Sequence, residues 1–172
     1  RRSDWLEGRL HGAVSSFLEG PSFDRESNLY CVDIPYGRIL RVSPGGEFSA
    51  IAEYDGEPNG LKIHKDGRIF VADQKNGIVI VDPVAGTVKP FLPRVNLERL
   101  KGPNDLVFAS NGDLYFTDQG QSGWQDPTGR VICVRANGNV EVLLTGIPSP
   151  NGIVFSPDES VIDVAARVVD VP

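Results

Sequence analysis

Two segments of the sequence decide the fold: 58–73, PNGLKIHKDGRIFVAD, and 103–118, PNDLVFASNGDLYFTD. The second begins 45 residues after the first, and each consists of apolar runs separated by a turn that contains glycine. Apolar or alternating runs of four to six residues, bounded by Gly, Asn and Asp, are typical of short β-strands joined by hairpins. A period of about 40 to 50 residues marks an array of supersecondary units. The sequence therefore predicts a series of similar β-sheets.

Further copies of this repeat flank the two segments. One ends at Asp33, and another opens at Pro150 with the same Pro-Asn-Gly sequence that opens the copy at Pro58. Within the copy at Pro58 the pattern predicts four strands, near 60–64, 68–73, 77–81 and 87–92. Four short antiparallel strands per repeat are typical of a propeller blade. The predicted fold is an all-β β-propeller built from four-stranded antiparallel blades. About three and a half blades of an expected six are present. They are predicted at residues 18–57, 58–102 and 103–149, with an incomplete blade at 150–172.

The repeats visible in the sequence are too few for a closed propeller. Closure protects the sheet edges and needs about four to eight blades. In the last repeat, the run from Val161 to Ala166 lacks the acid that ends the corresponding runs at Asp73 and Asp118. The sequence is therefore expected to be a truncated piece of a longer domain. Helical periodicity is nearly absent, and 97–101 is expected to form at most one helical turn.

The composition argues against several classes of protein. Hydrophobic residues make up 40% of the 172 residues and charged residues 23%, which is typical of a globular chain. The formal net charge of −6 argues against nucleic acid, because affinity for phosphate backbones comes from clustered Lys and Arg. No apolar stretch approaches the ~18 residues that cross a bilayer, and no signal peptide is visible, so no membrane partner is expected and a cytoplasmic location is the default. Cys31 and Cys133 lie in apolar runs and are expected to be buried free thiols.

One position recurs at the start of the inner strand of each repeat, where propeller blades converge on a central channel. It is occupied by Glu19, Asn59, Asn104 and Asn151. A carboxylate with several amide oxygens is a donor set that hard cations such as Ca²⁺ prefer. An alternative stays open, since Pro-Asn-Gly and Pro-Asn-Asp are also ordinary turn sequences. Glu19 discriminates between the two, because it breaks the Asn pattern and puts a charge on the expected axis.

Six short motifs follow one another along the chain: Glu19-Gly20-Pro21, Glu57-Pro58-Asn59-Gly60, Gly102-Pro103-Asn104-Asp105, Leu114-Tyr115-Phe116-Thr117-Asp118, Asp126-Pro127-Thr128-Gly129-Arg130 and Pro148-Ser149-Pro150-Asn151-Gly152. In this order they resemble the senescence marker protein, gluconolactonase and luciferin-regenerating enzyme family of six-bladed propellers. The resemblance extends from about Leu18 to Asp158, which is most of the chain. Several motifs in the right order are far more specific than any one of them.

The resemblance implies a hydrolase that opens a small-molecule lactone, such as a sugar lactone. It also implies one divalent metal ion at the centre of the channel, usually Ca²⁺ and in some members Zn²⁺ or Mn²⁺. By this resemblance Glu19 and Asn151 bind the metal. Asn104 binds the metal or the substrate, and Asn59 lines the channel. The metal polarises the lactone carbonyl for attack by water.

The resemblance leaves two residue roles and two other functions open. Asp118 is a candidate substrate residue, with a blade-closing acid as the alternative. The catalytic Asp of the family belongs to a later blade and is expected beyond Pro172. A non-catalytic propeller that serves as a binding module is one other function, although a scaffold has no need of the acid at Glu19. Phosphotriester hydrolysis in the same site is the other, and a substrate assay would separate it.

Overall fold

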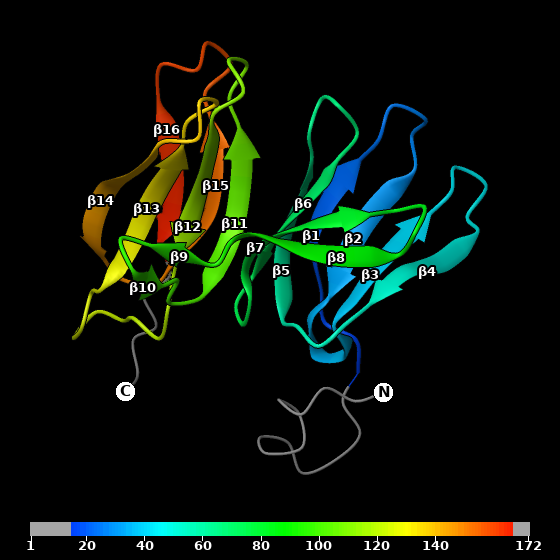
Figure 1. Cartoon of the computed structure of the whole chain (residues 1–172), viewed down its shortest axis with the longest axis horizontal. Helices are drawn as coiled ribbons and strands as arrows, with labels where there is room; N and C mark the ends of the chain where they lie inside the picture. Colours follow the sequence, from blue (N-terminus) through cyan, green and yellow to red (C-terminus); the bar gives the residue numbers. More distant parts are fainter. Residues whose placement is uncertain (1–14, 167–172) are drawn as a thin grey trace. The chain divides into compact units, whose positions relative to one another are not determined.

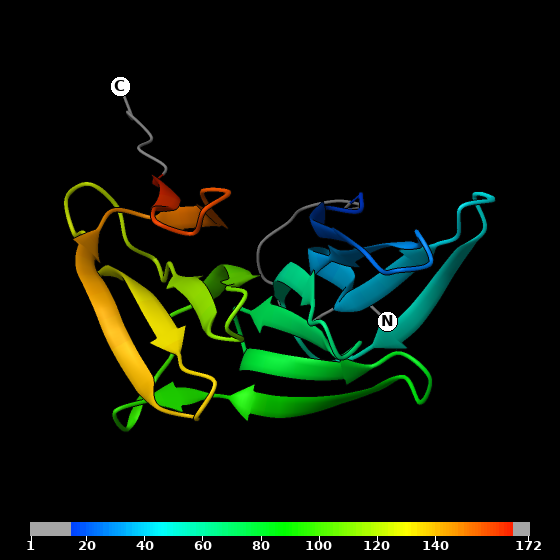
Figure 2. The same ribbon diagram turned by 90° about the horizontal axis from the view of Figure 1, so that it is seen from above.

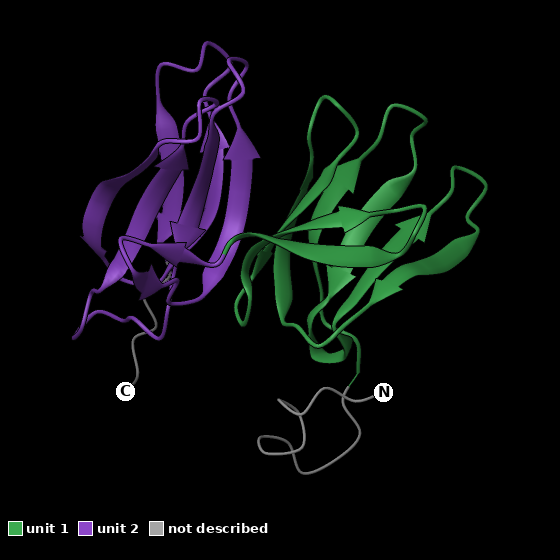
Figure 3. Cartoon of the chain, viewed as in Figure 1, with its two compact units in different colours: residues 1–92 green, residues 93–172 purple. Residues whose placement is uncertain are grey.

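The computed structural model describes residues 15–166, in which β-strands are joined by turns and one short 3-10 helix (Figure 1). The chain divides into two compact units, residues 1–92 and 93–172 (Figure 3). No helix of the described part of the chain is long and apolar enough to cross a membrane. The all-β class predicted from the repeat is confirmed.

Unit 1 contains two four-stranded antiparallel sheets, in which each strand pairs with the next one along the chain. The first sheet has the order β1-β2-β3-β4, and the second has the order β5-β6-β7-β8. The strands of the first are β1 (Leu18–Phe23), β2 (Leu29–Asp33), β3 (Arg38–Val42) and β4 (Phe48–Glu53). Those of the second are β5 (Pro58–Ile63), β6 (Ile69–Asp73), β7 (Gly77–Asp82) and β8 (Thr87–Leu92).

Unit 2 contains one four-stranded antiparallel sheet, a two-stranded sheet and a short hairpin of two two-residue strands. The four-stranded sheet consists of β11 (Pro103–Phe108), β12 (Leu114–Asp118), β13 (Gly129–Val134) and β14 (Val140–Ile147). The two-stranded sheet consists of β15 (Pro150–Phe155) and β16 (Ile162–Ala166), and β15 packs against β11 and β12 (Figure 2).

The observed strands overlap those that the repeat predicts, and the predicted hairpin turn at Lys65-Asp66-Gly67 is present. There the His64 N–H donates to the Arg68 carbonyl at 2.9 Å. The sheets lie inside the four segments predicted as blades, and the last six residues of 150–172 lie outside the described residues. The boundaries between the blades stay a prediction.

Segment 97–101, which the sequence predicts to form at most one helical turn, contains none. Instead β9 (Arg94–Val95) and β10 (Glu98–Arg99) form a two-residue hairpin. Its turn residues, Asn96 and Leu97, have φ of 50° and 72°. Positive φ at both central residues matches the right-handed twist of the flanking strands, which a helical turn would not. The 3-10 helix η1 (Ile34–Tyr36), which ends at Gly37 with φ 59°, was also not predicted.

The core of each unit follows the sheet pattern: the second and third strands of each four-stranded sheet are the most buried, the fourth is more exposed, and the first is largely buried in β5 and β11 but mostly exposed in β1. In unit 1, inward-facing aliphatic side chains of both sheets form one cluster, which includes Val32, Ile39, Leu61, Val71 and Val81. In unit 2, buried apolar side chains include Leu106, Phe116, Ile132 and Ile153. Cys31 and Cys133 are buried and free, as predicted, and burial raises the pKa of both thiols.

A buried acid ends the second strand of each four-stranded sheet. Asp33, Asp73 and Asp118 are at most 1% exposed, and each accepts a backbone N–H from just before the first strand of its sheet. The donors are Phe17 N at 3.0 Å, Glu57 N at 3.0 Å and Gly102 N at 2.9 Å, respectively. In the two-stranded sheet Ala166 lies opposite Pro150, at the register position that the acid occupies elsewhere, so this sheet lacks the acid, as predicted.

Tyr54 supplies a further hydrogen bond to one of these acids, and we expect Tyr54→Phe to destabilise unit 1. The Tyr54 hydroxyl donates to Asp73 Oδ2 at 2.7 Å. Burial raises the pKa of Asp73 above its ordinary 3.8, and this hydrogen bond opposes the rise. Loss of a hydrogen bond to a buried charged group costs about 1.5–3 kcal/mol. Urea unfolding at pH 7 measures that loss.

The same substitution has a second readout in the pKa of Asp73. Because the folded pKa is above the unfolded one, the contribution of Asp73 to stability falls as the pH rises from 3.8 through the folded pKa. The variant should raise the pKa of Asp73 further, which a carbon-detected NMR titration would follow. An unchanged pKa and an unchanged free energy of unfolding would contradict the role given to this hydroxyl.

Candidate functional site

The predicted axial residues occupy one register position in all four sheets. Leu18 pairs with Asp33, Pro58 with Asp73, Pro103 with Asp118 and Pro150 with Ala166, so the residues that follow are equivalent. These are Glu19, Asn59, Asn104 and Asn151. Glu19 and Asn59 belong to unit 1, and Asn104 and Asn151 belong to unit 2.

The strand register shifts beside each of these positions. The shift lies between Glu19 and Ser22 in β1 and between Pro58 and Gly60 in β5. In β11 and β15 it begins at the proline that precedes the Asn. A β-bulge re-aims a side chain and is common next to active sites. The repeat is therefore more than a turn signal, because it places a polar side chain at a break in the pleat four times.

Within unit 1, a glycine brings β1 close to β5 just after Glu19. Gly20 has φ 59°, and a Cβ atom there would lie 2.4 Å from Leu61 N and 2.8 Å from Asn59 O. Only glycine fits such an approach in the left-handed region. Glu19 thus lies on a strand that the next residue, Gly20, holds against the backbone of Asn59. The Glu19 side chain is exposed, and Asn59 is 9% exposed.

Within unit 2, one hydroxyl connects the strands of Asn104 and Asn151. Thr117 Oγ1 donates to the Asn151 carbonyl at 2.6 Å and accepts the Asp105 N–H at 3.1 Å. Thr117 is fully buried, so this bridge between β12, β11 and β15 is shielded from water. The structure therefore brings the backbones at Asn104 and Asn151 together on neighbouring strands. Asn104 is 5% exposed, and Asn151 is half-buried.

Gln119 is a polar residue of this region that the sequence placed only within a loop. Its Oε1 accepts Asn104 Nδ2 at 3.1 Å, and its Nε2 donates to Ser149 Oγ at 2.7 Å. Gln119 begins the loop from 119 to 125, which also contains Trp124. Trp124 is 72% exposed, whereas Gln119 and Ser122 at the start of the loop are hydrogen-bonded into the sheet.

Asp118 makes the contacts of a blade-closing acid. Its Oδ1 accepts the N–H groups of Lys101 at 2.7 Å and Gly102 at 2.9 Å. Its Oδ2 accepts Arg130 Nε at 3.0 Å and pairs with Arg130 Nη2, and both side chains are buried. That Asp118 binds substrate stays a prediction. The contacts described here are those expected of the alternative role, a blade-closing acid.

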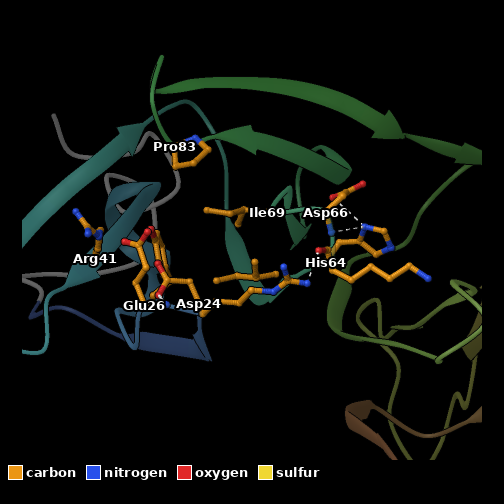
Figure 4. Close-up of a pocket in the computed structure, with 12 residues that line it drawn as sticks. Asp24, Glu26, Arg41, His64, Asp66, Ile69 and Pro83 are labelled. Atoms are coloured by element: carbon orange, nitrogen blue, oxygen red, sulfur yellow. Dashed lines mark hydrogen bonds and ion pairs between the residues drawn. The ribbon is translucent and has the colours of Figure 1, made fainter.

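A cavity of about 370 Å³ in unit 1 lies at the opposite end of the strands from Glu19 and Asn59 (Figure 4). The turns after β1 and β5 line it, and the Arg25 guanidinium donates from one turn to the Lys65 carbonyl on the other at 3.0 Å. In Figure 4, Glu26 and Asp24 lie on one side and the His64–Asp66 pair on the other. Asp24 accepts three hydrogen bonds from its own turn, which lower its pKa against the effect of burial. The cavity is thus a junction between turns.

The donors at the axial positions fit a hard cation. Across residues 15–166 no group of three or more His, Cys, Asp or Glu could hold a metal, so a site there would need further oxygen donors, such as side-chain amides or backbone carbonyls. The Asn104 Nδ2 is engaged by Gln119, which leaves Oδ1 as the acceptor. A carboxylate with amide oxygens suits Ca²⁺, which takes oxygen ligands in flexible geometry. The roles of Glu19, Asn104 and Asn151 as metal ligands stay a prediction.

Comparison with known proteins defines the class to which this fold and these positions belong. The sequence profile described as "SMP-30/Gluconolactonase/LRE-like region" matches residues 17–170, and the chain belongs to this family. Lactonase drp35 of Staphylococcus aureus (strain MRSA252) is 32% identical over 167 residues, which cover 92% of this chain and 49% of the relative. The gluconolactonase of Zymomonas mobilis is 30% identical over 165 residues, covering 83% and 46%.

Solved structures agree with this assignment at the level of the fold. A gluconolactonase of Xanthomonas campestris has a TM-score of 0.81 at 23% identity, over 90% of this chain and 56% of that protein. Regucalcin of Agrobacterium tumefaciens, described as a calcium-binding protein, has a TM-score of 0.63 at 21% identity, over 84% and 48%. The resemblance and the propeller class of fold are confirmed. The chain spans about half the length of the curated relatives that it matches.

Proposed function

We propose that the chain carries part of the site of a metal-dependent hydrolase that opens lactone rings. The observation that carries this proposal is the exposed carboxylate of Glu19 at the register position where the other three sheets have asparagine. Within the described part of the chain this carboxylate makes no hydrogen bond or ion pair, so it is available to a cation. The relatives named lactonase and gluconolactonase support a small-molecule lactone as the substrate class.

The proposed roles follow from the donor types. Glu19 and Asn151 would hold the ion through a carboxylate and an amide oxygen, and Asn104 would hold the ion or a substrate oxygen. Asn59 would line the channel. Ca²⁺ is the preferred ion, because all of these donors are hard oxygens and because a structural neighbour is described as calcium-binding. When bound, the ion would polarise the lactone carbonyl and stabilise the negative charge that develops on its oxygen.

The attacking water also needs a base. Three buried acids, Asp33, Asp73 and Asp118, accept hydrogen bonds from backbone N–H groups of their own sheets. Their carboxylates therefore have a structural role. By the family resemblance, the base is a different acid from these three. General acid–base catalysis contributes typically about 10²–10⁴-fold, so the metal-dependent part of the rate should be measurable without it.

The test is a lactone-opening assay on this chain with D-glucono-1,5-lactone, followed by proton release. We expect a rate above that of buffer in the presence of Ca²⁺, and we expect EDTA to remove the excess. A chain that binds Ca²⁺ by calorimetry but does not accelerate opening would instead be a binding module. Acceleration of diethyl p-nitrophenyl phosphate hydrolysis without lactone opening would favour the phosphotriesterase alternative.

A further inference from the structure

The carboxamide of Asn104 is part of a directional series of hydrogen bonds in unit 2. Asn104 Nδ2 donates to Gln119 Oε1 at 3.1 Å, and Gln119 Nε2 donates to Ser149 Oγ at 2.7 Å. Each amide has distinct donor and acceptor ends, so the direction of one bond determines the direction of the next. Since Nδ2 of Asn104 is the donor, its Oδ1 is free to accept from a ligand.

A second path of hydrogen bonds closes this series into a ring. The Ser149 N–H donates to Ser122 Oγ at 3.0 Å, and Ser122 Oγ donates to the Gln119 carbonyl at 2.6 Å. Gln119 is therefore attached to Ser149 through both its side chain and its backbone. Ser122 is 9% exposed, and Gln119 and Ser149 are half-buried.

The ring also holds the backbone that leads into Asn151. Ser149 has φ 45°, a strained conformation for a non-glycine residue that persists only where its surroundings hold it. Two of the hydrogen bonds of the ring end on this residue, and β15 begins directly after it. The two asparagines of unit 2 that the proposed function assigns to the site are thus connected through Gln119.

We propose that Gln119 is a positioning residue, which holds the Asn104 carboxamide with Oδ1 presented to the cation. This inference rests on the proposed function for the identity of the ligand and deepens it by naming a residue that controls one donor. Replacing a residue that hydrogen-bonds to a metal ligand without contacting the metal typically changes metal affinity by about 10–100-fold. Gln119 does not itself need to contact the metal or the substrate.

The experiment compares Gln119→Met with Gln121→Met. Methionine is close in size to glutamine but cannot donate or accept as an amide does, and Gln121 is an exposed residue of the same loop. Two quantities are measured: the Ca²⁺ dissociation constant by calorimetry, and the side-chain NH₂ resonances of Asn104 in metal-free protein, assigned with Asn104→Asp. Circular dichroism and thermal unfolding confirm that both variants are folded.

We expect Gln119→Met to shift the Asn104 NH₂ resonances, to speed their exchange with water and to weaken Ca²⁺ binding by about 10–100-fold. Gln121→Met should leave all of these at their wild-type values. Unchanged Asn104 resonances, or a changed resonance with unchanged Ca²⁺ affinity, would overturn the inference. A wild-type chain that binds no Ca²⁺ would overturn the proposed metal site and with it the ligand-presenting role, even if Asn104 still responds to Gln119→Met.

Discussion

Replacement of Glu19 by Gln is expected to weaken Ca²⁺ binding by at least about 100-fold, above the range found for residues that only support a ligand. Glu19 is the one carboxylate among the four equivalent inner-strand positions, so the substitution removes the entire formal charge of this donor set. Oxygen sites for Ca²⁺ are tuned by the number of charged ligands. Calorimetric titration of the folded variant with CaCl₂ measures the loss.

Glu26→Gln is the matched control for this experiment. Glu26 is an exposed acid on the turn after β1, in the same unit, and its substitution makes the same change in net charge. A general electrostatic effect would weaken Ca²⁺ binding equally in both variants, whereas a ligand role affects only Glu19→Gln. Equal affinities in Glu19→Gln and the wild type would remove Glu19 from the metal site.

Replacement of Asp118 by Ala is expected to have the largest effect on folding, a loss of about 3–5 kcal/mol. The Arg130 guanidinium would stay buried without its partner, with its side chain only 10% exposed. The N–H groups of Lys101 and Gly102 would also lose their acceptor. A shift of the urea unfolding midpoint, monitored by circular dichroism, gives the size of the loss.

The control for Asp118→Ala uses the other acid beside Arg130. Glu98 Oε2 lies 3.5 Å from Arg130 Nη1, but the Glu98 side chain is 71% exposed. Solvent screens such a pair, so Glu98→Ala should cost less than about 1 kcal/mol. If Asp118→Ala were folded and as stable as Glu98→Ala, the blade-closing role would be wrong and the substrate assignment would gain support.

The repeat allowed much of the fold to be predicted. Turns such as 65–67 carry glycine where the backbone needs positive φ, and Gly67 has φ 89°. Strand alternation then sets the register, because a slip by one residue would turn the buried face of a strand to water. The same repeat identified Glu19 and its equivalents, since a position at the start of each inner strand could be counted along the chain.

Other features could not be predicted, either because no local pattern marks them or because they depend on contacts between distant residues. Asn96 and Leu97 form the turn of the β9–β10 hairpin, and Leu97 is not a usual residue for positive φ. The role of Gln119 depends on Ser149, thirty residues later, which no local pattern connects to it. Asp118 was ambiguous for the same reason, because its partner Arg130 belongs to the next strand and a long loop separates them.

The register shift beside each inner-strand position also has an evolutionary consequence. A β-bulge re-aims the side chain at that position out of the regular alternation between the two faces of the sheet. Because the break is repeated in each sheet, an Asn-to-Asp or Glu-to-Gln change at one of these positions would alter the charge of the donor set by a single unit. Such a scaffold could change its preferred cation, and the substrate that the cation serves, by independent single substitutions while the sheets stay the same.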